Sequence, residues 1–152
     1  MANVREYLTK LNLARASLVI SIIIGEGSLG STFDHIGDDK FRLAGFGPDG
    51  GFNNTHSWFH FFREGVADVA TLILLCLLLF GPQRFRSPET WTIGIILCLG
   101  YYAPFWIGAP FNSALIAPNL GATMIHVGMA AFAFLAMLLA RKDFYRARSQ
   151  LT

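Results

Sequence analysis

Charged residues are scarce in this chain of 152 residues. Only 14% are Asp, Glu, Lys or Arg and 53% are hydrophobic, whereas charged residues make up about 25% of an ordinary soluble domain. The formal net charge is only +2, which does not indicate a nucleic-acid partner. A chain of this length is expected to form one domain. The composition predicts that this domain, residues 1–152, lies in a lipid bilayer.

Cysteine is also scarce, since Cys76 and Cys98 are the two in the chain. They lie in different apolar segments and form no Cys-x-x-Cys pair, so they are predicted to be small apolar packing residues and not a redox pair. The Gly-x-Ser-x-Gly pattern of hydrolase nucleophiles is absent as well. The glycine-rich segment Gly25–Gly30 follows an apolar helix and not a strand, which argues against a phosphate-binding loop.

Four apolar segments are candidates to cross a bilayer, which requires about 20 mostly apolar residues. They cover about residues 11–29, 58–80, 91–107 and 120–140. They predict an all-α membrane fold, a bundle of four transmembrane helices. The first segment follows basic residues as a signal peptide does, but it lacks an Ala-x-Ala site and is predicted to be a retained helix.

Basic residues gather at one end of the predicted helices. Nine of the twelve Lys and Arg lie before or in the first turns of the first helix, in the 81–90 loop or in the C-terminal tail. The positive-inside rule therefore predicts that both termini and this loop are cytoplasmic. Residues 30–57 and 108–119 then form the outer loops.

The long outer loop, residues 30–57, combines many glycines with phenylalanines and acids. A disordered linker would have fewer aromatic residues. Glycines allow tight turns and phenylalanines require burial, so the loop is predicted to fold back as a lid over the mouth of the bundle. The alternative is a segment that packs for stability or docks on a partner subunit.

Four ionisable residues interrupt the apolar segments, where burial in hydrocarbon costs at least about 2.5–3.5 kcal/mol. All lie toward the outer membrane face, and the other three histidines lie on or near that face. The ionisable residues are Glu26, Glu64, Asp68 and His126, and the other histidines are His35, His56 and His60. This distribution predicts a site in the outer half of the bundle.

The densest part of this site is on the second helix. Four residues recur at a spacing of four, which places them along one stripe: His56, His60, Glu64 and Asp68. The stripe is predicted to face the bundle interior, near Glu26 and His126. The opposite stripe is predicted to face lipid and consists of Phe61, Leu72, Leu75 and Leu79. Two carboxylates in a low dielectric do not both ionise easily, so they are expected to share a proton or a cation. The alternative is a structural hydrogen-bond network between helices.

Three functions remain open. The first is binding or transformation of a lipid-like, apolar small molecule by proton transfer, with Glu64, Asp68 and His126 as catalytic groups. Residues predicted to contact that ligand are Glu26, His60, Tyr101 and Trp106, although the two aromatic residues also fit an ordinary aromatic belt.

The second function is a divalent-metal or haem site, because imidazole and carboxylate groups suit several metals. The candidate ligands are His56, His60, His126 and Glu64, and a haem would take His60 and His126 as axial ligands. The third function is an accessory subunit of a larger membrane complex. Homo-oligomerisation is compatible with each of the three, and the sequence does not decide whether the chain is an enzyme.

The run Trp58–Gly65, which reads WFHFFREG, resembles the start of a helix in the EXPERA superfamily of sterol isomerases and the sigma-2 receptor. His60 and Glu64 match that family's His-x-x-x-Glu-Gly pattern. The resemblance implies an aromatic membrane cavity for sterols or other amphiphiles, with Glu64 as proton carrier. It covers about ten residues, and the family's other acidic positions are not identifiable here.

A second resemblance concerns the segment Asn54-Thr55-His56. It resembles the segment that precedes the second helix in small bacterial four-helix membrane proteins. That resemblance implies the inner (plasma) membrane of a bacterium and names no activity.

Overall fold

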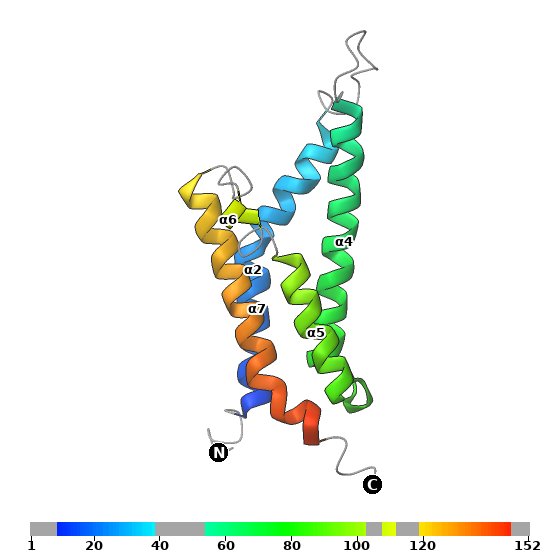
Figure 1. Ribbon diagram of the computed structural model, residues 1–152, viewed down its shortest axis with the longest axis vertical. Coiled ribbons are helices and arrows are strands. Elements are labelled where there is room, and N and C mark those ends of the chain that lie inside the picture. The colour runs from blue at the N-terminus through cyan, green and yellow to red at the C-terminus, as the bar shows by residue number, and fades with distance from the viewer. Residues whose placement is uncertain (1–8, 39–53, 103–107, 112–118, 147–152) are drawn as a thin grey trace, which may run out of the picture. The chain divides into compact units, whose positions relative to one another are not determined.

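The computed structural model describes residues 9–38, 54–102, 108–111 and 119–146 (Figure 1). These residues form helices and contain no strand, which confirms the predicted all-α class. Four helices are long: α2 (Lys10–Gly37), α4 (Asn54–Phe80), α5 (Pro88–Tyr101) and α7 (Leu120–Arg146). Two short elements lie between them, the 3₁₀ helix η1 (Gln83–Phe85) and the single turn α6 (Ala109–Phe111).

The chain forms two compact units. The bundle unit consists of Met1–Gly25 and Thr71–Thr152, and the hairpin unit consists of Glu26–Ala70. The first half of α2, the second half of α4, and α5 and α7 therefore belong to the bundle unit. The second half of α2 and the first half of α4 make up the hairpin unit.

Helices α2 and α7 pack closely in the bundle unit. The Ser17 hydroxyl donates to the carbonyl of Phe132, and the Ser21 hydroxyl donates to the carbonyl of Met129, each at 2.7 Å. Position numbers rise along α2 as they fall along α7, so the two helices are antiparallel. A side-chain hydrogen bond between membrane helices contributes about 0.6 kcal/mol on average. Small residues on both helices let the backbones approach closely enough to form these bonds.

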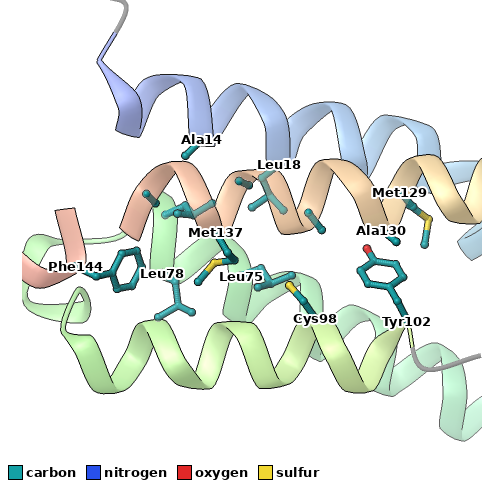
Figure 2. Close-up of a cluster of buried hydrophobic side chains, with 14 residues drawn as sticks. Ala14, Leu18, Leu75, Leu78, Cys98, Tyr102, Met129, Ala130, Met137 and Phe144 are labelled. Carbon is teal, nitrogen blue, oxygen red and sulfur yellow. The ribbon is translucent and has the colours of Figure 1, made fainter. Parts of the chain in front are cut away.

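The core of the bundle unit lies between α2, α4, α5 and α7 (Figure 2). Figure 2 shows Leu78, Met137 and Phe144 projecting into the same apolar cluster. The indole of Trp91 on α5 donates to the Met137 carbonyl at 2.8 Å. Cys98 is fully buried in this cluster and is a free cysteine. This position agrees with the prediction that it is an apolar packing residue.

The turn between α4 and α5 is built from local hydrogen bonds. The Gly81 amide donates to the Leu77 carbonyl at 3.0 Å and ends α4. Ser87 and Thr90 form a capping box, in which each side chain accepts a bond from the other residue's backbone amide. Pro88 takes the first helical position, where a missing amide hydrogen costs nothing. Helix α5 therefore begins three residues before the predicted boundary near Trp91.

Two of the described helices, α2 and α7, are long and apolar enough to cross a membrane by length and composition. Helix α4 is apolar in its second half only, because Arg63, Glu64 and Asp68 interrupt the first. Helix α5 has 14 residues, a length of about 21 Å, which is shorter than the hydrocarbon core of about 30 Å. Two of the four predicted spans are therefore candidate membrane spans among the described residues, and the four-span membrane bundle stays a prediction.

Helix α2 extends beyond its predicted end at residue 29 and continues to Gly37. Residues 30–37 of the predicted outer loop are therefore helical, and the glycine-rich segment Gly25–Gly30 lies within the helix. Each glycine costs a helix about 1 kcal/mol relative to alanine, so packing in the hairpin unit must offset this cost. Residues 54–57, at the other end of the predicted loop, are helical as well, because α4 begins at Asn54. Residues 39–53 of that loop lie outside the described residues. Helix α7 likewise continues past residue 140 to Arg146.

The prediction that Leu75 and Leu79 face lipid is wrong. They are only 2% and 0% exposed and belong to the core. A stripe of residues spaced by four rotates by about 40° at each step. By Asp68 the stripe has turned onto the same face as Leu75, seven residues later, and the leucines continue the buried face of α4.

Replacing Gly81 by Ala is expected to lower the free energy of unfolding by about 1–3 kcal/mol. The new Cβ would collide with the Leu77 carbonyl oxygen and lie 2.9 Å from Cδ2 of Phe85. The control is Gly27→Ala, because a Cβ at Gly27 meets nothing within 4 Å. That change removes a flexible residue from a helix and is expected to stabilise by about 0.5–1 kcal/mol. Unfolding in detergent, followed by circular dichroism, measures both effects, and equal effects would contradict the close contact at Gly81.

Candidate functional site

The hairpin unit is held together by packing around Gly65 on α4. A Cβ at this glycine would lie 3.3 Å from Cδ1 of Ile36 and 3.4 Å from Cε1 of Phe33. The His35 ring stacks on Phe61, with ring centroids 4.8 Å apart and an interplanar angle of 27°. The second half of α2 therefore packs on the first half of α4, and Gly65 permits the close approach. This packing positions the ionisable residues of both helices.

Asp68 lies on the buried face of α4, one turn after Gly65. Asp68 is only 9% exposed, whereas Val66 and Val69 in the same turn of the helix are 53% and 37% exposed. Burial of a carboxyl group is costly unless its environment compensates. An ionisable residue at such a position is a candidate functional group.

The two glutamates of the predicted site have a different environment. Glu64 and Glu26 are both exposed. Asp68 is therefore the buried carboxyl group of these three, and a proton or cation shared between Glu64 and Asp68 stays a prediction. Glu64 lies one turn from Asp68 along α4, at the exposed edge of the buried face.

His60 is partly buried, and its Nδ1 lies 3.2 Å from Nη2 of Arg63. A guanidinium group only donates hydrogen bonds, so Nδ1 of His60 must accept and carries no hydrogen. The neutral ring then holds its hydrogen on Nε2. Phe59 lies under Arg63, with 5.9 Å between the guanidinium carbon and the ring centroid, and makes an edge contact with the His60 ring. This arrangement fixes both the orientation and the tautomer of His60.

His126 belongs to the bundle unit, on α7, and is partly buried. Its Nδ1 lies 2.7 Å from the Ala122 carbonyl oxygen. A carbonyl only accepts, so Nδ1 of His126 carries the hydrogen and the neutral ring has its lone pair on Nε2. The two histidines therefore have opposite tautomers: His60 is fixed as an Nε2–H donor and His126 as an Nε2 base or ligand.

The remaining predicted residues have different positions. Tyr101 ends α5, is partly buried and makes an edge contact with Tyr102 at 4.7 Å between ring centroids. Trp106 lies outside the described residues, and so does the side chain of His56, whose backbone belongs to α4. Glu26, His60, Glu64 and Asp68 lie in the hairpin unit, whereas Tyr101 and His126 lie in the bundle unit.

No group of three or more His, Cys, Asp or Glu side chains able to hold a metal ion occurs among the described residues. The predicted metal ligands include His56, whose side chain lies outside that part of the chain. The metal or haem site stays a prediction, and so does the role of Glu64 as one of its ligands.

Sequence reasoning missed the contact between His35 and Phe61, because it assigned His35 to a loop. The missed signal is the spacing of Phe33 and Ile36, which are three residues apart, as apolar positions on one helix face are. Both pack against Gly65 in the structure. This spacing indicates that the helix continues through His35.

In comparisons with known proteins, no protein-family model, no curated protein and no solved structure matches the chain. The resemblance of Trp58–Gly65 to the EXPERA superfamily therefore stays a prediction. The fold itself defines a helical protein with two candidate membrane spans.

The opposite tautomers of the two histidines are directly testable. Long-range proton–nitrogen correlation NMR at neutral pH is expected to show the hydrogen on Nε2 for His60 and on Nδ1 for His126. The variant Arg63→Leu should weaken the Nε2–H preference at His60 and leave His126 unchanged, because the Arg63 guanidinium contacts Nδ1 of His60. Observation of one common tautomer, or of an unchanged His60 in this variant, would contradict the assignment.

Proposed function

We propose that this chain is an integral membrane protein that binds a lipid-like amphiphile at the outer half of α4 and exchanges a proton with it. The observation that carries the proposal is the buried Asp68 in a helix half that also exposes large apolar side chains, among them Phe62 and Val66 at 53% each. A buried carboxyl group beside an apolar surface offers one polar contact for the head of an amphiphile and an apolar surface for its body.

The exposed surface supports the membrane assignment. Large apolar side chains are exposed on all four long helices, among them Ile23 at 64%, Ile73 at 54%, Ile96 at 61% and Leu138 at 59%. Exposure to water costs about 25 cal/mol for each Å² of apolar surface. Hydrocarbon removes this cost, so the surface matches a lipid environment.

The chemistry of the site supports proton exchange. A carboxyl group such as Asp68 is a general acid or base when its environment keeps the neutral form accessible. His60, fixed as an Nε2–H donor, and Glu64 lie on successive turns of the same helix toward its N-terminus. The EXPERA resemblance implies amphiphile binding for the same pair, His60 and Glu64. Glu26, also in the hairpin unit, is an additional ligand contact in this proposal, and Tyr101, Trp106 and His126 stay predicted participants.

The proposed orientation places both termini and the α4–α5 turn in the cytoplasm, because the basic residues gather there. A cysteine introduced at Gly50 is then expected to react with a membrane-impermeant maleimide on intact cells. A cysteine introduced at the exposed Gln83 in η1 should react only after lysis. The reverse pattern would invert the orientation and place the site at the cytoplasmic half. The measurement requires Cys76 and Cys98 to be replaced by Ala first.

Ligand binding is expected to depend on the Asp68 carboxyl. The purified full chain in nanodiscs is irradiated with a photoreactive sterol or a photoreactive fatty acid, and the labelled peptides are identified by mass spectrometry. Label from at least one probe is expected on the first half of α4. The variant Asp68→Asn should reduce it by about tenfold or more, since loss of one charged hydrogen bond costs at least about 1.4 kcal/mol. Glu64→Gln should reduce label less, because Glu64 is exposed.

The matched control is Asp34→Asn, an exposed acid in the same unit, which should leave labelling unchanged. Proton exchange is tested separately with an unsaturated sterol in heavy water, where a deuterium atom should enter the bound sterol and Asp68→Asn should abolish its entry. Full labelling of a folded Asp68→Asn protein would rule out the carboxyl-dependent site. Labelling without deuterium entry would restrict the function to binding.

A further inference from the structure

Two arginines meet at the C-terminal end of α4, at the opposite end of that helix from the proposed ligand site. Nε of Arg15 on α2 donates to the Leu79 carbonyl at 2.9 Å. Nη1 of Arg86 approaches the same oxygen at 3.4 Å and donates to the Gly81 carbonyl at 2.9 Å. Both cations therefore lie at the negative end of the helix dipole, which favours positive charge. Because they share one acceptor atom, their guanidinium groups are close neighbours.

The charge at this point is not balanced. Arg86 is only 9% exposed and Arg15 is partly buried. Burial lowers the pKa of Arg86, the neighbouring Arg15 lowers it further, and Asp143 on α7 raises it. Two cations and one carboxylate leave a net positive charge in a partly desolvated place. An additional anion would reduce the repulsion between the two guanidinium groups.

Both guanidinium groups retain hydrogen-bond donors. Arg86 makes both of its bonds through Nη1, and Arg15 uses Nε and, to the Asn12 side chain, Nη1. No described residue accepts a bond from Nε or Nη2 of Arg86 or from Nη2 of Arg15. Guanidinium donors match the geometry of phosphate oxygens.

We propose that Arg15 and Arg86 bind the phosphate of an anionic phospholipid headgroup at the cytoplasmic surface. Arg15, the more exposed of the two, contacts the phosphate, and Arg86 is the buried charge behind it. The proposal rests on the membrane location and orientation given under the proposed function. Phe80 supplies the argument for a lipid over free phosphate: it is 47% exposed and lies under Arg15, 5.7 Å from guanidinium carbon to ring centroid. The exposed Phe80 ring offers an acyl chain an apolar contact next to the guanidinium groups that would bind the phosphate.

Other arginines at this end of the bundle unit provide controls because they have different partners. Arg84 lies over the ring of Phe85, and Arg141 lies over the rings of Trp91 and Tyr145. Neither contacts the Leu79 carbonyl. They contribute to the general basic surface, which attracts anionic lipids without a defined site.

The test is native mass spectrometry of the purified full chain titrated with phosphatidylglycerol, with phosphatidylcholine and with inorganic phosphate. One phosphatidylglycerol per chain is expected to bind at concentrations at which phosphatidylcholine does not. Arg15→Gln should weaken this binding by about tenfold, the size of one lost charge-assisted hydrogen bond. Arg84→Gln, the matched control, should change it by less than about twofold, as for an exposed charge. Arg86→Lys keeps the charge but loses the guanidinium fork, and an intermediate loss is expected.

Equal weakening by Arg15→Gln and Arg84→Gln would overturn the defined site in favour of a diffuse basic surface. Equal binding of phosphatidylcholine, or full displacement of phosphatidylglycerol by equimolar inorganic phosphate, would overturn the anionic-lipid assignment. Circular dichroism checks folding, and Arg15→Lys with the same titration replaces Arg15→Gln if the latter does not fold. Loss of sterol and fatty-acid labelling with phosphatidylglycerol binding intact would contradict the proposed function alone. The converse result would contradict this inference alone.

Discussion

The close contact between α2 and α7 is the interaction on which the bundle unit depends. Helices in a bilayer gain little from apolar burial against one another, because lipid tails are as apolar as leucine. Close backbone approach and interhelical hydrogen bonds supply the stability instead. Ser17 and Ser21 are 4% and 2% exposed, and both hydroxyls donate to carbonyls of α7. Glycines also bring the two helices close: a Cβ at Gly25 on α2 would collide with the Met129 side chain on α7, and a Cβ at Gly128 would lie 3.5 Å from Cγ2 of Ile24.

Helices α4 and α5 complete the core of the bundle unit. With small residues used between α2 and α7, the larger side chains Leu75, Leu79 and Met137 fill the core on the side of α4 and α5. A Cβ added at Gly94 on α5 would collide with the end of the Met137 side chain and would lie 3.1 Å from Cδ1 of Leu78. The end of α4 is held by Arg15 from α2, so the first helix anchors both α7 and α4. Replacement of the small residues by larger ones would therefore disturb more than one helix pair.

The parts that sequence reasoning predicted are those with local causes. Long apolar runs predicted the four long helices, and two of these helices are candidate membrane spans. The start of α5 was predicted three residues too late, near Trp91, although Ser87 and Pro88 are a capping residue and the residue that favours the first helical position. The end of α2 was not readable, because four glycines between Gly25 and Gly37 disfavour a helix locally. The packing of Phe33 and Ile36 against Gly65 and the stacking of His35 on Phe61, contacts between distant parts of the sequence, favour its continuation.

The error about the leucines has a physical cause that bears on the site. Residues spaced by four do not stay on one face, and the stripe that begins with His60 turns onto the packing face by Asp68. Asp68 and Glu64 were predicted to share one polar stripe. In the structure Asp68 is buried, at 9% exposed, whereas Glu64 is exposed. One face of α4 thus serves two purposes along its length. In the bundle unit it supplies Leu75 and Leu79 to the apolar core, and in the hairpin unit it buries a carboxyl group one turn from Gly65. Asp68 thus places an ionisable group on a face of α4 that is otherwise apolar in the bundle unit, and the proposed function depends on this residue.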